Sequence, residues 1–203
     1  MCSGRSLGLA ERRLLIAITG ASGAVYAKRF IETAARGFDR IYLTASENAL
    51  AIMRDEIGLS RLEDAVPAEY ADRFTIYDSA DVSALPCSGS HVYEGAVIIP
   101  CSMGTVGRIA AGVSNDLVTR AADVCLKERR KLVLVTRETP FSLVHLENLT
   151  LLARSGALVL PACPAFYNRP KSVAELVDFI VDRALAQFGI TSGLAEPWSG
   201  REE

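Results

Sequence analysis

Short apolar runs alternate with longer amphipathic segments along most of the chain. The first run, Leu14 to Ile18, is continuously apolar and ends in Thr19-Gly20, as is typical of a strand buried on both faces of a parallel sheet. Comparable runs predict strands at 40–44, 74–77, 95–99, 131–135 and 157–160, and Pro100 is expected to end the strand at 95–99. Helices are predicted between them at 25–36, 47–56, 114–127, 142–154 and 172–188. This alternation predicts an α/β fold with helices on both faces of a parallel sheet.

One domain is expected, at residues 14–189. The chain has 203 residues, half of them hydrophobic, which suffices for a single packed core. Residues 1–13 form an N-terminal extension, and residues 190–203 form a C-terminal tail that is polar apart from Leu194 and Trp198. These two side chains would be better buried against a neighbouring subunit than left in water.

Charge and composition argue against several functional classes. The formal net charge is -2, so the basic surface of a nucleic-acid-binding protein is not expected. The five cysteines are odd in number and no two have C-x-x-C spacing. Neither a disulfide framework nor a zinc site is therefore indicated, and a reducing cytoplasm fits best. No apolar run is long enough to span a membrane, and residues 1–13 lack the apolar region of a signal peptide.

A first candidate loop, Thr19-Gly20-Ala21-Ser22-Gly23-Ala24, follows the first predicted strand. Ligands of open α/β sheets bind beyond the carboxyl ends of the strands. Glycines there let backbone N–H groups approach an anion at a helix N-terminus. NAD is the weaker interpretation, because Tyr26 stands where the dinucleotide fingerprint needs a glycine, and a P-loop is excluded because Gly-Lys-Ser/Thr is missing. A plain turn with Ser22 as the helix cap is an equal alternative.

A second candidate loop, Pro100-Cys101-Ser102-Met103-Gly104-Thr105, follows the strand at 95–99. Its hydroxyl groups and glycine lie where a helix should start, which suits a flavin ring edge or a phosphate. An ordinary N-cap formed by Ser102 is the alternative. Cys101 could act as a nucleophile, but no histidine is near it in sequence, and a buried structural cysteine is the commoner case.

Seven segments occur in one order along residues 14–189. They are Ile-Thr-Gly-Ala-Ser-Gly-Ala (18–24), Pro-Cys-Ser-Met-Gly-Thr (100–105), Thr-Arg-Ala-Ala-Asp-Val (119–124), Leu-Lys-Glu-Arg-Arg (126–130), Arg-Glu-Thr-Pro-Phe-Ser (137–142), His-Leu-Glu-Asn (145–148) and Pro-Ala-Cys-Pro-Ala-Phe-Tyr (161–167). As a set they resemble the UbiX/Pad1 family of flavin prenyltransferases. Ala27 and Ala165 depart from it, since the family often has glycine at both positions, and this affects backbone freedom more than chemistry.

The resemblance implies a flavodoxin-like (Rossmann-like), doubly wound parallel sheet in three αβα layers. It also implies a reaction in which dimethylallyl monophosphate alkylates reduced FMN at N5, after which a bond to C6 closes a fourth ring. The product, prenylated FMN, serves UbiD-type decarboxylases. Members of the family form homo-oligomers, commonly dodecamers, whose active sites are shared between subunits.

Site residues follow from the same resemblance. The expected FMN contacts are Gly20, Ala21, Ser22, Ser46, Ser102, Met103, Gly104, Thr105 and Arg120. The expected prenyl-phosphate contacts are Arg120, Lys127, Arg137, Tyr167 and Arg183. The catalytic candidates are Ser22, Glu56, Lys127 and Glu138, and no metal ligand is expected. Arginine suits phosphate because its guanidinium presents a bidentate fork. A solvated helix face is the plain alternative for the helical cations, and Ser88-Gly89-Ser90 resembles a mobile loop that covers the site.

Two other functions compete with prenyl transfer. FMN-dependent cysteine decarboxylases have a similar fold, but they rely on a histidine after an early strand, and this chain has no histidine before His91. A non-catalytic flavin-carrying decarboxylase subunit would need no prenyl-phosphate cations. The retained Arg120, Lys127, Tyr167 and Arg183 argue against that second alternative.

Overall fold

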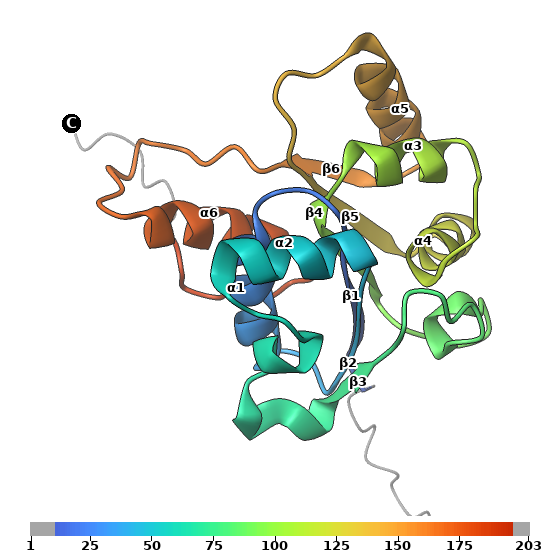
Figure 1. Cartoon of the computed structure of the whole chain (residues 1–203), viewed down its shortest axis with the longest axis horizontal. Coiled ribbons are helices and arrows are strands. Elements are labelled where there is room, and N and C mark those ends of the chain that lie inside the picture. The colour runs from blue at the N-terminus through green and yellow to red at the C-terminus, as the bar shows by residue number, and fades with distance from the viewer. Residues whose placement is uncertain (1–10, 197–203) are drawn as a thin grey trace, which may run out of the picture.

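The apolar runs become the strands of one parallel sheet in the computed structural model, which describes residues 11–196 (Figure 1). The strands are β1 (Arg13–Ile18), β2 (Arg40–Ala45), β3 (Phe74–Ile76), β4 (Gly95–Cys101), β5 (Lys131–Thr136) and β6 (Leu158–Pro161). Their order is β3-β2-β1-β4-β5-β6, and every neighbouring pair is parallel. The predicted doubly wound α/β sheet is confirmed, and the order reverses direction between β1 and β4, where such sheets bind ligands.

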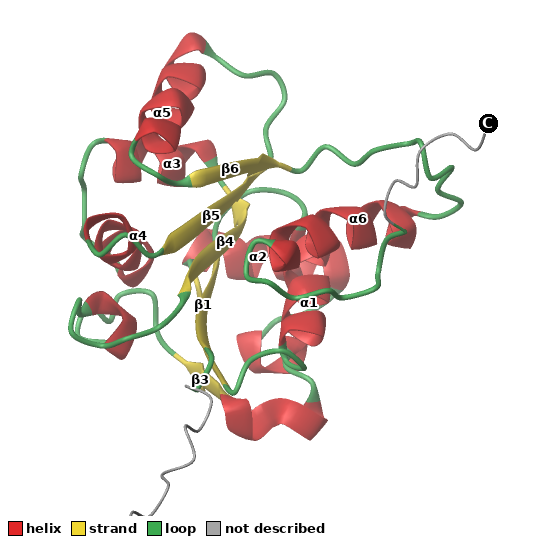
Figure 2. Cartoon of the chain, turned by 180° about the vertical axis from the view of Figure 1, so that it is seen from behind, coloured by secondary structure: helices red, strands yellow, loops and turns green. Residues whose placement is uncertain are grey.

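Helices cover both faces of the sheet and complete three layers (Figures 1 and 2). They are α1 (Ala24–Ala34), α2 (Glu47–Ile57), α3 (Met103–Ala110), α4 (Leu117–Lys127), α5 (Leu143–Arg154) and α6 (Val173–Ala186), with short 3₁₀ segments η1 (Leu62–Ala65), η2 (Ala68–Arg73) and η3 (Leu85–Cys87). Helices α1, α2 and α6 lie on one face, while α3 and α4 lie on the other and α5 packs on α3 and β6. Among residues 11–196, no helix is long and apolar enough to cross a bilayer.

The two faces of β1 supply two separate cores. Leu14, Ile16 and Ile18 pack with α1 and α6, whereas Leu15 and Ala17 pack with α3 and α4. Because successive side chains of a strand point to opposite faces, a continuously apolar run is what a sheet covered on both sides requires.

Several element boundaries differ from the predictions by one to three residues, and two of these differences have a clear physical cause. Strand β4 does not stop at Pro100 but continues to Cys101, because the pairing with β5 is irregular between Ile98 and Cys101 and so tolerates a residue without an N–H group. Helix α4 begins at Leu117 rather than at 114, since Asp116 caps it by accepting the Thr119 N–H at 2.7 Å.

Leu194 is half-buried against the chain's own core beside α6, so its burial does not require a neighbouring subunit, contrary to the prediction. Trp198 lies outside the described residues.

Candidate functional site

Thr19 joins the loops that follow β1 and β4. The side chain is polar but buried, and it directly follows the apolar strand β1. Its hydroxyl donates to the Pro100 carbonyl at 2.9 Å and accepts the Ser102 N–H at 2.8 Å. The two candidate loops of the sequence therefore lie side by side at the carboxyl ends of the strands. Thr19 was missed as a site residue, and its signal was a polar side chain at the end of an apolar run.

The loop 19–24 also contacts the ends of β2 and β5. The Ser46 N–H donates to the Ile18 carbonyl at 3.0 Å, and the Arg137 Nε donates to the Ser22 carbonyl at 3.1 Å. Four strand ends thus meet at one loop, and Glu138 follows directly after Arg137. The structure brings together the candidates Gly20–Ser22, Ser46, Ser102–Thr105, Arg137 and Glu138.

Glu56 is the anion at the N-terminus of α1. Its Oε2 accepts the N–H groups of Gly23 and Ala24 at 2.9 and 2.8 Å. Burial raises the pKa of Glu56, but the hydrogen bond from Ser22 and these two N–H groups outweigh it, so the pKa is lowered. The interpretation of Ser22 as the helix cap is therefore wrong. The cap position is Gly23, at φ +112°, and the carboxylate of a distant glutamate takes the helix donors.

The start of α3 keeps its donors open. Ser102 caps the helix by accepting the Thr105 N–H at 3.2 Å. The N–H groups of Met103 and Gly104 have no acceptor among residues 11–196. Gly104 is exposed, and a Cβ placed there would meet only the Ser102 Oγ, at 4.0 Å. Two free donors at an open helix N-terminus, beside the Arg137 cation, fit a phosphate or the polar edge of a flavin.

Contacts of Gly20 and Arg108 add detail that the sequence did not reveal. A Cβ on Gly20 would lie 2.8 Å from the Asn48 Cβ, so this glycine permits the loop to pass close to α2. The Arg108 guanidinium contacts the Thr105 hydroxyl at 3.4 Å and pairs with Asp116. Arg108 therefore supports the second loop from α3.

Cys101 is not placed as a nucleophile. It is fully buried, and burial raises the pKa of its thiol to about 12, so the thiolate is scarce at neutral pH. The structural interpretation of this cysteine is favoured. In residues 11–196, no three His, Cys, Asp or Glu side chains gather as metal ligands.

Arg120 and Lys127 lie on α4, away from the loop 19–24. The Arg120 guanidinium donates to the Cys87 carbonyl at 3.3 Å and pairs with Asp123 at 3.2 Å. Lys127 is exposed in the last turn of α4, four residues before β5 begins. It therefore lies at the amino ends of the strands, opposite the candidate site of the same chain.

Tyr167 lies in the loop before α6, and Arg183 lies on α6 itself. The Tyr167 ring packs edge-on against Phe179, with centroids 6.1 Å apart. Arg183 follows Phe179 by four residues on the same helix face and is exposed. The α6 helix ends at the amino ends of the strands, where Lys131 contacts the Gln187 carbonyl. The expected polar set is thus divided among three places in one chain.

The Ser88-Gly89-Ser90 loop packs against the end of α4. Arg130 donates to the carbonyls of Gly89 and His91 at 2.5 and 2.8 Å. Its guanidinium also lies 4.6 Å from the Tyr93 ring centroid. The loop is therefore beside Lys127 and does not cover the candidate site of its own chain.

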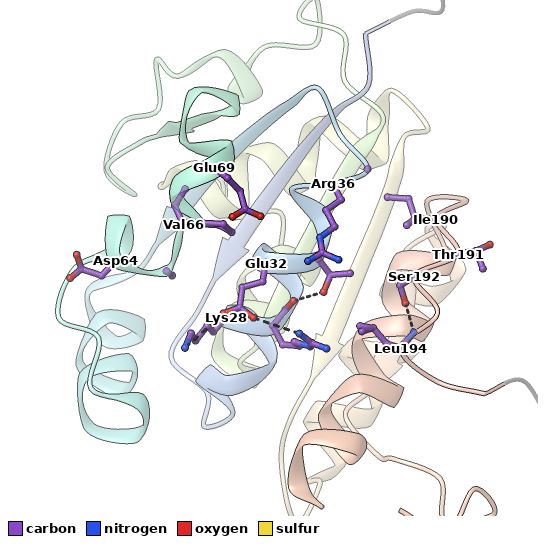
Figure 3. Close-up of a pocket in the computed structure, with 15 residues that line it drawn as sticks. Lys28, Glu32, Arg36, Asp64, Val66, Glu69, Ile190, Thr191, Ser192 and Leu194 are labelled. Atoms are coloured by element: carbon purple, nitrogen blue, oxygen red, sulfur yellow. Dashed lines mark hydrogen bonds and ion pairs between the residues drawn. The ribbon is translucent and has the colours of Figure 1, made fainter.

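A cavity of about 660 Å³ lies elsewhere, between α1, the 3₁₀ segments after α2 and the residues after α6 (Figure 3). Its lining carries both signs of charge, including Lys28, Arg36, Glu32 and Glu69. Arg36 precedes β2, so this cavity is not at the carboxyl ends of the strands. Its mixed charges do not indicate a particular ligand, and the converging loops remain the candidate site.

Comparisons with known proteins show what the whole chain is similar to. A family model described as Flavoprotein matches residues 5–185. The flavin prenyltransferase UbiX of Methanothermobacter thermautotrophicus is 41% identical over 191 residues, 94% of this chain and 97% of the relative. The crystal structure of AnUbiX (PadA1) in complex with FMN and dimethylallyl pyrophosphate has a TM-score of 0.85 and 37% identity, covering 95% of this chain and 100% of that chain. A dodecameric FMN-dependent UbiX-like decarboxylase from Escherichia coli O157:H7 has a TM-score of 0.86 and 39% identity, covering 93% and 100%.

Proposed function

The chain belongs to the UbiX/Pad1 family of flavin prenyltransferases, and we propose that it binds FMN at the loop 19–24 and prenylates it. Reduced FMN supplies the nucleophilic N5 and C6 atoms, and dimethylallyl monophosphate supplies the five-carbon unit. The observation that carries the proposal is the meeting of four strand ends at one loop, with open N–H donors and a cation.

The residues of one chain are suited to holding the flavin. The N–H groups of Met103 and Gly104 can donate to an anionic or carbonyl oxygen, and the Arg137 guanidinium can add charge-assisted bonds. The hydroxyls of Ser46 and Ser102 flank the same edge. Because Glu56 already accepts the N–H groups of Gly23 and Ala24 at the start of α1, we propose that the ligand's anionic group lies nearer α3 than α1.

The departing phosphate needs cations beyond Arg137. Lys127, Tyr167 and Arg183 are the proposed ligands, yet Lys127 and Arg183 lie toward the amino ends of the strands in the same chain. We therefore propose that one complete site takes residues from more than one copy, with a dodecamer as the assembly. The dodecameric relative supports this proposal.

Glu138 is the proposed proton acceptor. It is partly exposed beside Arg137, and its Oε1 accepts the Thr139 N–H at 3.0 Å. A carboxylate placed here can take up the proton that ring closure at C6 releases. Exclusion of water from the allylic cation requires a cover that the open sheet does not supply alone.

Two finer assignments complete the proposal. A UbiD-type decarboxylase is the proposed recipient of prenylated FMN, and the cytoplasm is the proposed location. The cysteine-decarboxylase alternative is disfavoured because His91 lies before β4, at the amino ends of the strands. There its Nε2 is hydrogen-bonded to the Tyr42 hydroxyl at 2.7 Å. No histidine in residues 11–196 occupies the loops of the candidate site.

Mass analysis of the released flavin tests the function. The protein is incubated anaerobically with reduced FMN and dimethylallyl monophosphate, and a flavin enlarged by one five-carbon unit is expected. An Arg137→Ala variant should lose this product, whereas Arg36→Ala, which removes an exposed arginine outside the site, should keep it. If the wild-type protein releases only unmodified FMN, the proposed prenylation is refuted and only flavin binding remains as a function.

A further inference from the structure

A row of hydrogen bonds connects the start of α4 with the start of α3. The Arg108 guanidinium, on α3, pairs with the Asp116 carboxylate and reaches the Asn115 side-chain oxygen at 3.4 Å. Its other amino group donates to the Thr105 hydroxyl at 3.4 Å. The hydroxyls of Thr105 and Ser102 lie 3.1 Å apart. The row thus ends at the cap residue of α3, in the second candidate loop.

Burial decides which way the Thr105 hydroxyl points. Thr105 is 2% exposed, and a buried O–H group without an acceptor is costly. Among residues 11–196, the Ser102 Oγ is the only hydrogen-bond partner of this hydroxyl that can accept a proton, because Arg108 can only donate. The Thr105 hydroxyl therefore accepts from Arg108 and donates to Ser102.

The role of the Ser102 hydroxyl follows from that direction. Its oxygen accepts the Thr105 N–H at 3.2 Å and the Thr105 O–H at 3.1 Å, which uses both of its lone pairs. Once Thr105 donates to it, its own proton has no acceptor within residues 11–196. Ser102 is half-buried at the carboxyl ends of the strands, so this proton is available to a ligand.

We infer that Arg108 is a positioning residue for flavin binding, which holds Ser102 as a hydrogen-bond donor toward FMN. The inference rests on the proposed function, because it takes FMN as the ligand. The Ser102 hydroxyl joins the N–H groups of Met103 and Gly104 in a surface that only donates. Such a surface selects a group that only accepts, namely a carbonyl oxygen, a deprotonated ring nitrogen or a phosphate oxygen. Arg108 also strengthens the donor, because hydrogen bonds in series polarise one another.

Arg108 acts through Ser102 and not on the ligand itself. Its guanidinium is bonded to Asp116 and Thr105, and Asp116 is held in place because it caps α4. The guanidinium N–H keeps the Thr105 proton away from its side of the hydroxyl. Without it, the Thr105 proton can turn to that partly exposed side, Ser102 can donate to Thr105 instead, and the donor toward FMN is lost.

Arg108→Met tests the inference, since it removes the guanidinium and keeps an apolar stem. The variant should bind FMN about three- to tenfold more weakly, which is the usual value of one hydrogen bond, as measured by titration of the flavin-free protein. Arg108→Lys should recover part of the loss, because an ammonium group can still donate to Thr105. Arg36→Met changes an exposed arginine outside the site and should bind FMN as the wild type does. Wild-type affinity in Arg108→Met would overturn the inference.

A double-mutant cycle distinguishes positioning from a general loss of structure. If Arg108 acts through Ser102, adding Arg108→Met to a Ser102→Ala protein should weaken FMN binding no further. An equal loss from Arg108→Met in both backgrounds would overturn the inference. Thermal unfolding of the flavin-free proteins checks that each is folded. Arg108→Ala, which places a strong helix former in α3, gives a second substitution for the same cycle.

Riboflavin, which lacks the phosphate, identifies the acceptor. An equal loss of affinity for FMN and riboflavin in Arg108→Met assigns the acceptor to the flavin ring, and a loss for FMN alone assigns it to the phosphate. Either loss supports the inference, whereas no loss for either flavin contradicts it. The readout is binding alone. A wild-type protein that binds FMN but forms no prenylated flavin would therefore refute the proposed function and leave this test decisive.

Discussion

At the residue scale, Glu56 places a carboxylate of the chain itself at the N-terminus of α1, where an anionic ligand could otherwise bind. Its carboxylate accepts the N–H groups of the cap residue Gly23 and of Ala24, the first residue of α1, and a hydrogen bond from Ser22. These bonds stabilise the charged form, so the pKa of Glu56 lies below its ordinary value of 4.5. The glutamate acts on the helix as an N-cap side chain does, although it comes from the end of α2.

Glu56→Gln should lower stability at neutral pH by about 1 kcal/mol, the usual value of a helix cap discounted for the exposure of this group. A lowered folded-state pKa gives stability that is present above 4.5 and is lost as the pH falls through the folded-state value. The difference between the variant and the wild type should therefore shrink near pH 4. Urea unfolding at both pH values measures it. Asp55→Asn, an exposed neighbour, is the control and should show no such narrowing.

Arg183 should matter more for turnover than for flavin binding. It lies on α6 beside Phe179, far along the helix from the loop 19–24. Arg183→Ala should lose tenfold to a hundredfold in rate at limiting prenyl phosphate, since a charge-assisted contact is worth about 1.5–3 kcal/mol. The variant should still copurify with FMN, as judged by absorbance. Unchanged turnover would remove Arg183 from the site.

Sequence reasoning found side chains whose chemistry is visible and missed those whose role is to join loops. Arg137 and Glu138 were expected at a strand end and lie there. Thr19 was not singled out, because one hydroxyl bonded to Pro100 and Ser102 becomes evident only when β1 and β4 are adjacent. The role of Glu56 at α1 depends on a contact across 32 residues, which no local pattern encodes.

At the element scale, a substitution at the start of α3 should change FMN binding without lowering folding stability. Gly104→Ala adds a methyl group that meets only the Ser102 Oγ at 4.0 Å, so folding stability should stay the same or rise, by up to about 1 kcal/mol. The methyl group would stand where we propose that FMN approaches, and FMN retention should fall. Gly20→Ala is the contrasting variant, because its methyl group would meet the Asn48 Cβ at 2.8 Å.

Thermal unfolding of the flavin-free proteins, followed by FMN titration, distinguishes these two cases. Gly20→Ala should unfold at a lower temperature. Equal FMN affinity for Gly104→Ala and the wild type would contradict the proposal that FMN binds at the start of α3.

Elements were predicted well where one local pattern decides them. The apolar strands and amphipathic helices are present because their periodicity matches burial on two faces or one. The predicted boundaries were wrong where a single interaction decides the end of an element. Asp116 rather than Ser114 starts α4 because its carboxylate accepts the Thr119 N–H and hydroxyl, and Pro100 stays in β4 because the ladder is irregular there.

At the scale of the whole molecule, assembly should govern activity. We expect light scattering in dilute, near-physiological buffer to give a mass many times 21.8 kDa. Dilution that dissociates the assembly should reduce the rate per chain, because Lys127 and Arg137 of one chain lie at opposite ends of the sheet. A fully active monomer would contradict the shared site.

The outer strand β6 has a consequence for the newly made chain. Within residues 11–196 it pairs only with β5, so its other edge is unpaired there, and Leu158 is 37% exposed. Such an edge can template the addition of a foreign strand, and a net charge of -2 gives little repulsion between copies. Correct association must therefore be faster than aggregation during biosynthesis. We expect that a higher rate of synthesis in an overproducing host gives a larger share of the protein in inclusion bodies.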